Sequence, residues 1–506
     1  MTTSAIPFFQ PHLSQALPVI IGHKDYQDFR SQLERIDELL IKGGIEHEFV
    51  QRCIEHKEKE LAKLVKKAEG SVELCGKQLA ITSKIARRAL RCTIGRYLTG
   101  DNYRDFSNRL ADSYLFQRFC LLDQLGAIKP PSKSTLERYD KLVDEDSIRQ
   151  LINYLNIQAA TPSDETGKQP LDLEESVDIT ETYIDCTCVK ANIHFPVDWV
   201  LLRDAVLSLI SVILIIRNHG LKHRIPEPTR FITKINKLCI KMANSRRKKK
   251  AKKERKRILR QMKEIVKVVQ KHAERYRELL LSRREETDLT EKQATQIIMR
   301  IDNILNQLPQ AIKQAHDRII GDRSINNEDK ILTLYEDEIH VIVRGKAGAE
   351  VEFGNGLVLV EQKQGLIVDY DLIREQPAAD PSFIRPALER IHEVFHKYPD
   401  ALGGDRGFDS EEVRRFIEEN QIYNGICPKN PELFNERQKE ETFRRIQTRR
   451  AQTEGRIGIF KNSFLGRPLR SKSFDHRQLS VGWAVLAHNL WCLARLPRCQ
   501  QEKEHC

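Results

Sequence analysis

Arg450, Glu454 and Lys461 are the residues whose types and spacing most clearly suggest chemistry. They are separated by four and then seven positions, so on an α-helix that turns by about 100° per residue all three share one face. A carboxylate between two bases suits a site that holds a metal ion and a phosphodiester together, because the carboxylate binds the hard cation and the bases bind the phosphate. The same spacing also produces an ion-pair ladder on a solvated helix, so other acids in the chain must decide between these readings.

A second acid, Asp185, lies within a run of β-branched and aromatic residues from Tyr183 to Val189. This composition predicts a β-strand. Alternation along the strand would place Asp185 and Thr187 on one face and the two cysteines, Cys186 and Cys188, on the other. The cysteines are therefore expected to pack rather than to bind metal.

A third acid, Asp405, follows a short predicted strand that ends in Gly403–Gly404. Asp409, four residues later, is a rival carboxylate. We prefer Asp405 because it follows the strand directly, whereas Asp409 or Ser410 fits the N-cap of a helix that reaches Glu419.

Several segments, collinear from Asp185 to the C-terminus, resemble the DDE transposases of bacterial insertion sequences, which have a ribonuclease H-like core. The similar segments are IDCTCVKANIHFPVD, HVIVRGKAGAEVEFGNGLVLVEQ, GDRGFDS, YNGICPKNP, RRAQTEGRIGIFKNSFLGRPLRSK and GWAVLAHNLW. In that group the last acid lies in a Tyr-x2-Arg-x3-Glu-x6-Lys signature. Arg450, Glu454 and Lys461 keep its spacing, and Gln447 stands where the signature has tyrosine.

The resemblance implies a catalytic and metal-binding triad of Asp185, Asp405 and Glu454, with Arg450 and Lys461 contacting DNA. The implied fold is an α/β ribonuclease H-like catalytic core with a mixed sheet. An N-terminal all-α domain would precede the core, and a large helical insertion would follow its first strand.

The resemblance also implies a transposase that binds the terminal inverted repeats of its insertion sequence and catalyses metal-dependent DNA cleavage and strand transfer. Two Mg²⁺ ions, for which Mn²⁺ could substitute, would serve both steps. The partners would be double-stranded DNA and, in the synaptic complex, a homodimer or larger assembly in the bacterial cytoplasm, associated with the nucleoid. Two alternatives stay open: a nuclease on the same core that cuts without joining, and a catalytically idle DNA-binding remnant of a transposon.

Composition is consistent with this class. The chain has 506 residues and a formal net charge of +12, an excess that suits a polyanionic partner. Its eleven cysteines show no paired spacing, which is typical of reduced thiols. The N-terminus lacks the pattern of a signal peptide, and the longest apolar run, 205–216, is expected to be a buried helix too short to span a bilayer. No membrane association is therefore expected.

Residues 1–158 are predicted to form a helical DNA-binding domain. Helical periodicity runs through 26–67 and again through 83–142, where three helices have the outline of a helix-turn-helix, or equally of a plain helical bundle. Similar transposases use a TLERY-like element of this kind to bind inverted repeats. Lys133 and Arg138 are the candidate DNA contacts on the helix that Ser132 or Ser134 would cap.

The rest of the chain is predicted to contain a linker (159–176), the first core strand segment (177–198), a basic helical insertion (199–327) and the remainder of the core (328–506). The insertion contains a run of bases that a phosphate backbone would neutralise: Arg246, Arg247, Lys248, Lys249 and Lys250. In the last segment we expect strands at 330–334, 339–343, 350–353, 357–362 and 366–370, with Asn355–Gly356 as a hairpin turn. Helices are expected at 381–397 and 476–496.

Overall fold

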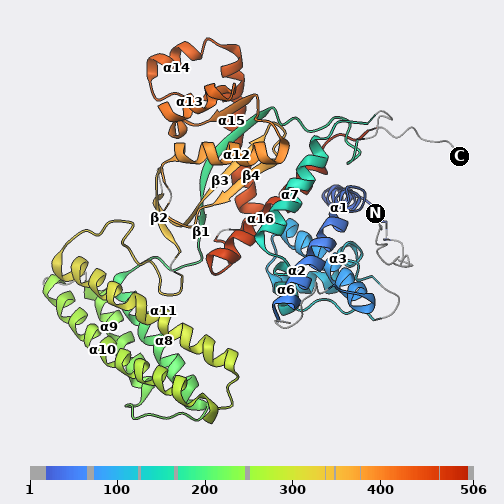
Figure 1. The fold of residues 1–506 in the computed structure, drawn as a ribbon. Helices are drawn as coiled ribbons and strands as arrows, with labels where there is room; N and C mark the ends of the chain where they lie inside the picture. The colour runs from blue at the N-terminus through green and yellow to red at the C-terminus, as the bar shows by residue number, and fades with distance from the viewer. Residues whose placement is uncertain are drawn as a thin grey trace. The chain divides into compact units, whose positions relative to one another are not determined.

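The computed structural model describes residues 17, 19–64, 73–123, 127–164, 169–245, 251–336, 338–346, 349–376, 378–466 and 468–499. The chain divides into two compact units (Figure 1). The first contains residues 1–189, 356–373 and 377–506, and the second contains 190–355 and 374–376.

Where the structure describes the N-terminal part of the first unit, it forms seven helices. They are α1 (Lys24–Lys42), α2 (Ile45–Leu64), α3 (Gly76–Thr99), α4 (Tyr103–Asp112), α5 (Tyr114–Phe119), α6 (Lys133–Asp140) and α7 (Glu145–Ala160). The periodicity of 26–67 is interrupted at Gly43–Gly44, where Gly44 adopts a positive φ of 71°. Ser113 separates α4 from α5 because its side chain caps α5 by accepting from the Phe116 amide.

The segment expected to be a linker is packed over its second half. Leu171 and Leu173 are buried, and Gln169 ties the chain to the end of α7 by donating to the Gln158 carbonyl at 2.9 Å. The buried guanidinium of Arg35 on α1 donates to the Leu171 carbonyl at 2.6 Å. In this region the chain is therefore a fixed connection between α7 and the sheet.

Six strands form the sheet within the described residues: β1 (Glu181–Lys190), β2 (His340–Lys346), β3 (Ala349–Gln362), β4 (Ile367–Leu372), β5 (Ala401–Gly404) and β6 (Tyr423–Ile426). Their order is β2-β3-β1-β5-β6, and β4 also pairs with β3. The pairs β1–β5 and β5–β6 are parallel, whereas β2 and β4 pair antiparallel with β3. This is a mixed sheet, as the sequence predicted, and helices flank it.

Alternation along β3 separates the two faces of the sheet in the first unit. Val358 and Val360 join a buried cluster with α12 (Ile384–Phe395) and α13 (Glu411–Glu419). Leu357 and Leu359 join the larger cluster formed by the N-terminal helices and α16 (Phe474–Leu493). Trp483 of α16 is fully buried there and donates its indole N–H to the Asp140 carbonyl at 3.0 Å, so it is a core residue, as expected.

Two strand predictions are wrong. Residues 330–334 form no strand, and Asn355–Gly356 is not a hairpin turn but lies within the continuous strand β3. The turn signal fails because the Asn355 side chain is fully buried and donates to the Glu338 carbonyl at 2.9 Å. Tertiary contacts thus override a local preference for a turn.

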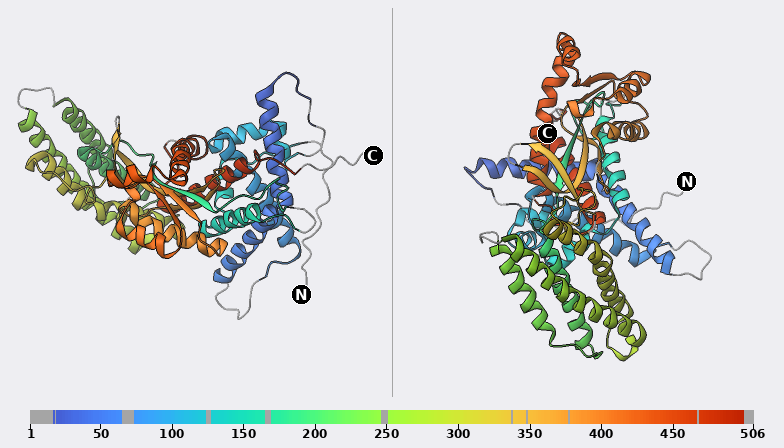
Figure 2. Two further views of the ribbon diagram at one scale, coloured as in Figure 1. Left: turned by 90° about the horizontal axis from the view of Figure 1, so that it is seen from above. Right: turned by 90° about the vertical axis from the view of Figure 1, so that its left-hand side faces the viewer.

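The second unit contains α8 (Asp198–Asn218), α9 (Pro228–Ser245), α10 (Ala251–Arg283) and α11 (Glu291–His316), four helices that pack side by side (Figures 1 and 2). Among the described residues, α8 is the one helix long and apolar enough to cross a membrane. It contains the apolar run 205–216, so the prediction that this run forms a helix too short to span a bilayer is wrong. Most of its apolar side chains are buried against the other three helices, as the reading of a buried helix requires.

Candidate catalytic site

Asp185 and Asp405 are neighbours across two parallel strands. The register of β1 and β5 pairs Glu181 with Ala401 and Tyr183 with Gly403. Two residues after this last pair come Asp185, within β1, and Asp405, directly after the end of β5. Side chains alternate with a period of two, so both acids lie on the sheet face that Tyr183 occupies.

The turn after β5 brings in a carboxylate that the sequence did not reveal. Asp405 caps a short 3-10 helix by accepting from the Gly407 amide at 2.7 Å. A Cβ added at Gly407 would lie 2.6 Å from Asp380 Oδ2 and 2.9 Å from Asp405 Oδ1. Asp380 lies just before α12, in a short 3-10 helix, Asp380–Phe383, and no periodicity or motif marked it.

Cys186, which follows Asp185 in the chain, lies near the same carboxylates. Burial raises the pKa of the Cys186 thiol, and the nearby carboxylates of Asp380, Asp185 and Asp405 raise it further. Its backbone amide donates to Asp185 Oδ1 at 2.7 Å. A raised pKa disfavours the thiolate form. Cys186 packs against the buried cluster that contains Ile184, in agreement with its expected packing role.

Helix α15 (Glu441–Ile459), which carries Glu454, is seated on this face of the sheet. Ile446 is fully buried in a small cluster with Tyr183. Two strand glycines, Gly403 and Gly425, leave room for it, since a Cβ on either would lie within 3 Å of Ile446 Cγ2. Glycine at these two positions therefore lets the helix approach the strands closely.

Polar contacts of Gln447 fix the N-terminal half of α15 to the strands β5 and β6. The Gln447 amide donates to the carbonyls of Gly404 and Gly425, at 3.2 and 2.5 Å. Its oxygen accepts from Arg450 Nε at 3.2 Å. Gln447, Arg450 and Glu454 are spaced by three and four residues, so they share one stripe of the helix.

The middle of α15 is held by residues that sequence reasoning missed. Glu361 of β3 is buried, accepts from Thr453 Oγ1 at 2.6 Å and pairs with Arg449 at 3.1 Å. The Arg449 guanidinium also lies over the Tyr183 ring, 4.7 Å from its centroid. These contacts fix the residue next to Glu454, whose own side chain is exposed.

Lys461 fixes the far end. It lies in a π-helical continuation, Phe460–Leu465, is only 6% exposed and donates from Nζ to Thr187 Oγ1 on β1 at 2.9 Å. The phosphate contact predicted for this residue stays a prediction; in the structure its ammonium makes a buried hydrogen bond to the residue two positions after Asp185.

The rival carboxylate, Asp409, has a structural environment. It is buried, pairs with both arms of Arg414 at 2.8 and 2.6 Å, and accepts from the Lys429 amide at 2.7 Å. Burial alone disfavours its charge, but Arg414 and the Lys429 amide offset this and hold the pKa of the Asp409 carboxyl below its usual range. Ser410, not Asp409, caps α13 by accepting from the Val413 amide.

The structure thus brings Asp185 and Asp405 together and places Glu454 on the helix over the same face. Among the residues that it describes, no group of three or more His, Cys, Asp or Glu side chains is close enough to hold a metal ion. Residues 355–490 match the family model described as "Transposase DDE domain". The chain carries a DDE transposase domain. The match includes Asp405 and Glu454 and begins after Asp185; comparisons with curated proteins and with solved structures gave no match.

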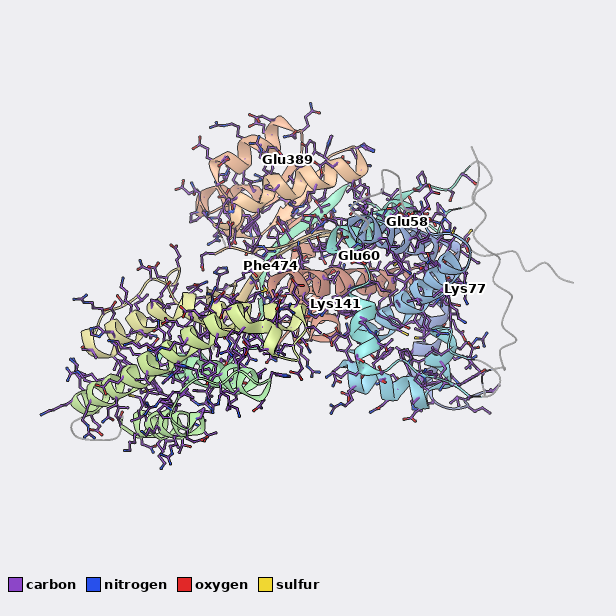
Figure 3. The ribbon with its side chains drawn as sticks, turned by 60° about the horizontal axis from the view of Figure 1, so that its bottom comes forward. Glu58, Glu60, Lys77, Lys141, Glu389 and Phe474 are labelled. Carbon is purple, nitrogen blue, oxygen red and sulfur yellow. The ribbon has the colours of Figure 1, made fainter. Side chains whose placement is uncertain are left out.

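The DNA contacts predicted on the N-terminal helices, Lys133 and Arg138, are exposed. Ser132 caps α6 by accepting from the Thr135 amide, and Lys133 and Arg138 lie on the helix surface. Lys133 and Lys141, the latter labelled in Figure 3, line a cleft of about 1080 Å³ between α6 and the start of α16. Acids also line this cleft, so it is not uniformly basic. The run Arg246–Lys250 lies outside the described residues.

Proposed function

We propose that this protein is a transposase that binds the terminal inverted repeats of its insertion sequence and catalyses metal-dependent DNA cleavage and strand transfer. The observation that carries the proposal is the register that makes Asp185 and Asp405 neighbours beneath the helix that bears Glu454. The mixed sheet with α12, α13 and α15 on its faces agrees with a ribonuclease H-like core.

The donor chemistry of the candidate site suits a divalent cation. The candidate ligands are carboxylate oxygens, which Mg²⁺ prefers together with water and substrate phosphate. Asp380 and Asp405 approach each other around Gly407, and two like charges at such a distance repel unless a cation neutralises them. Two bound Mg²⁺ or Mn²⁺ ions would activate the attacking oxygen and stabilise the leaving one.

The protein residues would then hold the metal and orient the DNA. Asp185, Asp405 and Glu454 would bind the metal, and Arg450, half-buried beside Gln447, would donate to a flanking phosphate. Lys461 would fix the end of α15 against β1. The anchors of α15 matter because the third carboxylate can act only while its helix keeps its place over the strands.

We further propose that residues 1–158 bind the inverted repeats through α6, with Lys133 and Arg138 as contacts, and that Arg246–Lys250 contact the DNA backbone. Joining two ends requires a homodimer or larger assembly on double-stranded DNA. The proposed location is the bacterial cytoplasm, at the nucleoid.

Cleavage and strand transfer on a labelled DNA end with Mg²⁺ test the proposal. Wild type is compared with Asp185→Asn, Asp405→Asn and Glu454→Gln, and with Glu441→Gln, an exposed acid in the first turn of the same helix. We expect the first three to bind DNA with unchanged affinity and to cleave at least about 10²–10³-fold more slowly, the usual loss when one transition-state-stabilising group is removed. Glu441→Gln should cleave at the wild-type rate.

Other outcomes separate the alternatives. A wild type that cuts but never joins is a nuclease on the same core, and one that binds but never cuts is an idle DNA-binding protein. Wild-type cleavage by Asp405→Asn would show that the site is wrong.

A further inference from the structure

Helix α9 (Pro228–Ser245) contains four bases and no acid. The bases are Arg230, Lys234, Lys237 and Lys241. At about 100° per residue, these four side chains fall within an arc of about 60°, so they form one line along the helix. We call these four residues the α9 basic stripe.

A neighbouring side of α9, centred about 90° around the helix from the stripe, packs into the helical unit. Ile235, Leu238, Met242 and Ser245 are buried, and Asn236 accepts from Arg203 of α8 at 2.8 Å. The α9 basic stripe lies on the side that remains open, where all four bases and the intervening Ile240, 62% exposed, face solvent. The fold therefore fixes the direction in which this line of charge points.

Acidic partners do not neutralise the stripe. In the described part of the chain, none of its four bases makes an ion pair or a side-chain hydrogen bond. Other bases of the same unit behave differently, since Lys252 pairs with Asp322 and Arg277 with Asp302. Neighbouring like charges on one helix face repel one another, so the stripe raises the free energy of the unbound protein. A bound polyanion would relieve this repulsion.

The length of the stripe matches a DNA backbone. From Arg230 to Lys241 it spans about 16 Å of helix, over which one DNA strand presents about five phosphates. We infer that the α9 basic stripe is a docking surface for the phosphate backbone of duplex DNA, separate from the catalytic site. The choice of DNA as the polyanion rests on the proposed function.

The salt dependence of binding measures the contact directly. The probe is a duplex of about 30 base pairs with a sequence unrelated to the element, in buffer without divalent metal. The test variant is Lys234→Gln/Lys237→Gln/Lys241→Gln. The matched control is Lys292→Gln/Arg300→Gln/Lys313→Gln on α11, three exposed bases on a helix that also carries Glu291 and Asp302. Both variants remove three positive charges, and glutamine preserves helix propensity.

We expect the α9 variant to lower the slope of log affinity against log salt by about 2.7, because each phosphate contact contributes about 0.9. Between 50 and 200 mM salt, wild type should lose about 40-fold more affinity than this variant. The α11 variant should keep the wild-type slope, and circular dichroism should show equal helicity in all three proteins.

An unchanged slope in the α9 variant, equal reductions in both variants, or a wild type that does not bind the duplex would each overturn the inference. The assay involves no cleavage and no triad residue. Its failure would therefore leave the catalytic proposal standing, and failure of the triad test would leave this result unaffected.

Discussion

Replacing Gly425 by alanine tests how closely α15 must sit on the sheet. Gly425 lies opposite Gly403 in the β5–β6 register. An added Cβ would lie 2.6 Å from Ile446 Cγ2 and 2.8 Å from the Leu402 carbonyl oxygen. Carbon atoms pack at about 3.5–4.0 Å, so Ile446 has to retreat from the strand by about 1 Å.

The consequence should reach the site, because Ile446 is fully buried and belongs to the helix that carries Glu454. A helix moves as a rigid element, so the carboxylate is displaced with it. Misplacement of a catalytic group by about 1 Å can cost about 10²-fold in rate, and overpacking of a core costs about 1–3 kcal/mol. We expect both effects in Gly425→Ala.

The assay is single-turnover cleavage of a DNA end, paired with thermal unfolding of the same samples. Gly458→Ala is the control, because this glycine also lies in α15 and an added Cβ meets no atom within 4 Å. Alanine there should stabilise the helix by about 0.5–1 kcal/mol and leave the cleavage rate near that of wild type. If folded Gly425→Ala cleaves as fast as wild type, the close seating of α15 does not position Glu454.

Two further predictions concern the neighbours of the triad. Asp409→Asn should lower the free energy of unfolding by roughly 2 kcal/mol at pH 7, because it weakens charge-assisted bonds to Arg414 and the Lys429 amide. Since the folded pKa of Asp409 is depressed, this stabilisation is present above about pH 4 and is lost as the pH falls through the folded pKa. Urea unfolding of wild type and variant should converge in acid, and an equal difference at pH 7 and pH 3 would contradict the assignment. Lys461→Met and Thr187→Val should each slow cleavage, and the double variant should show a coupling of about 1 kcal/mol; additive effects would mean that their hydrogen bond does not position α15.

The parts of the site that are local in sequence could be predicted. The strand around Asp185 follows from its β-branched residues, and the face shared by Arg450 and Glu454 follows from helical spacing. The mixed sheet and the match to a DDE transposase domain also agree with what the sequence predicted. These features depend on residues a few positions apart, where periodicity and propensity carry information.

What could not be predicted depends on contacts between distant segments. Asp380 reaches the Asp405 turn from a short 3-10 helix that no pattern announces. Asn355 is held within a strand by the Glu338 carbonyl, although Asn-Gly is a turn signal. Glu361 supports α15 across 92 residues of chain through Thr453. In each case the partner is remote, so no local pattern contains it.

The departure from the family signature at Gln447 has a structural reason. A primary amide offers two N–H donors and a carbonyl acceptor, and Gln447 uses both kinds of group. It donates to the carbonyls that end β5 and β6 and accepts from Arg450 one turn along the helix. A tyrosine hydroxyl has one proton to donate, so it could not donate to both strands. Glutamine therefore connects the packing of α15 on the strands to the orientation of the Arg450 side chain.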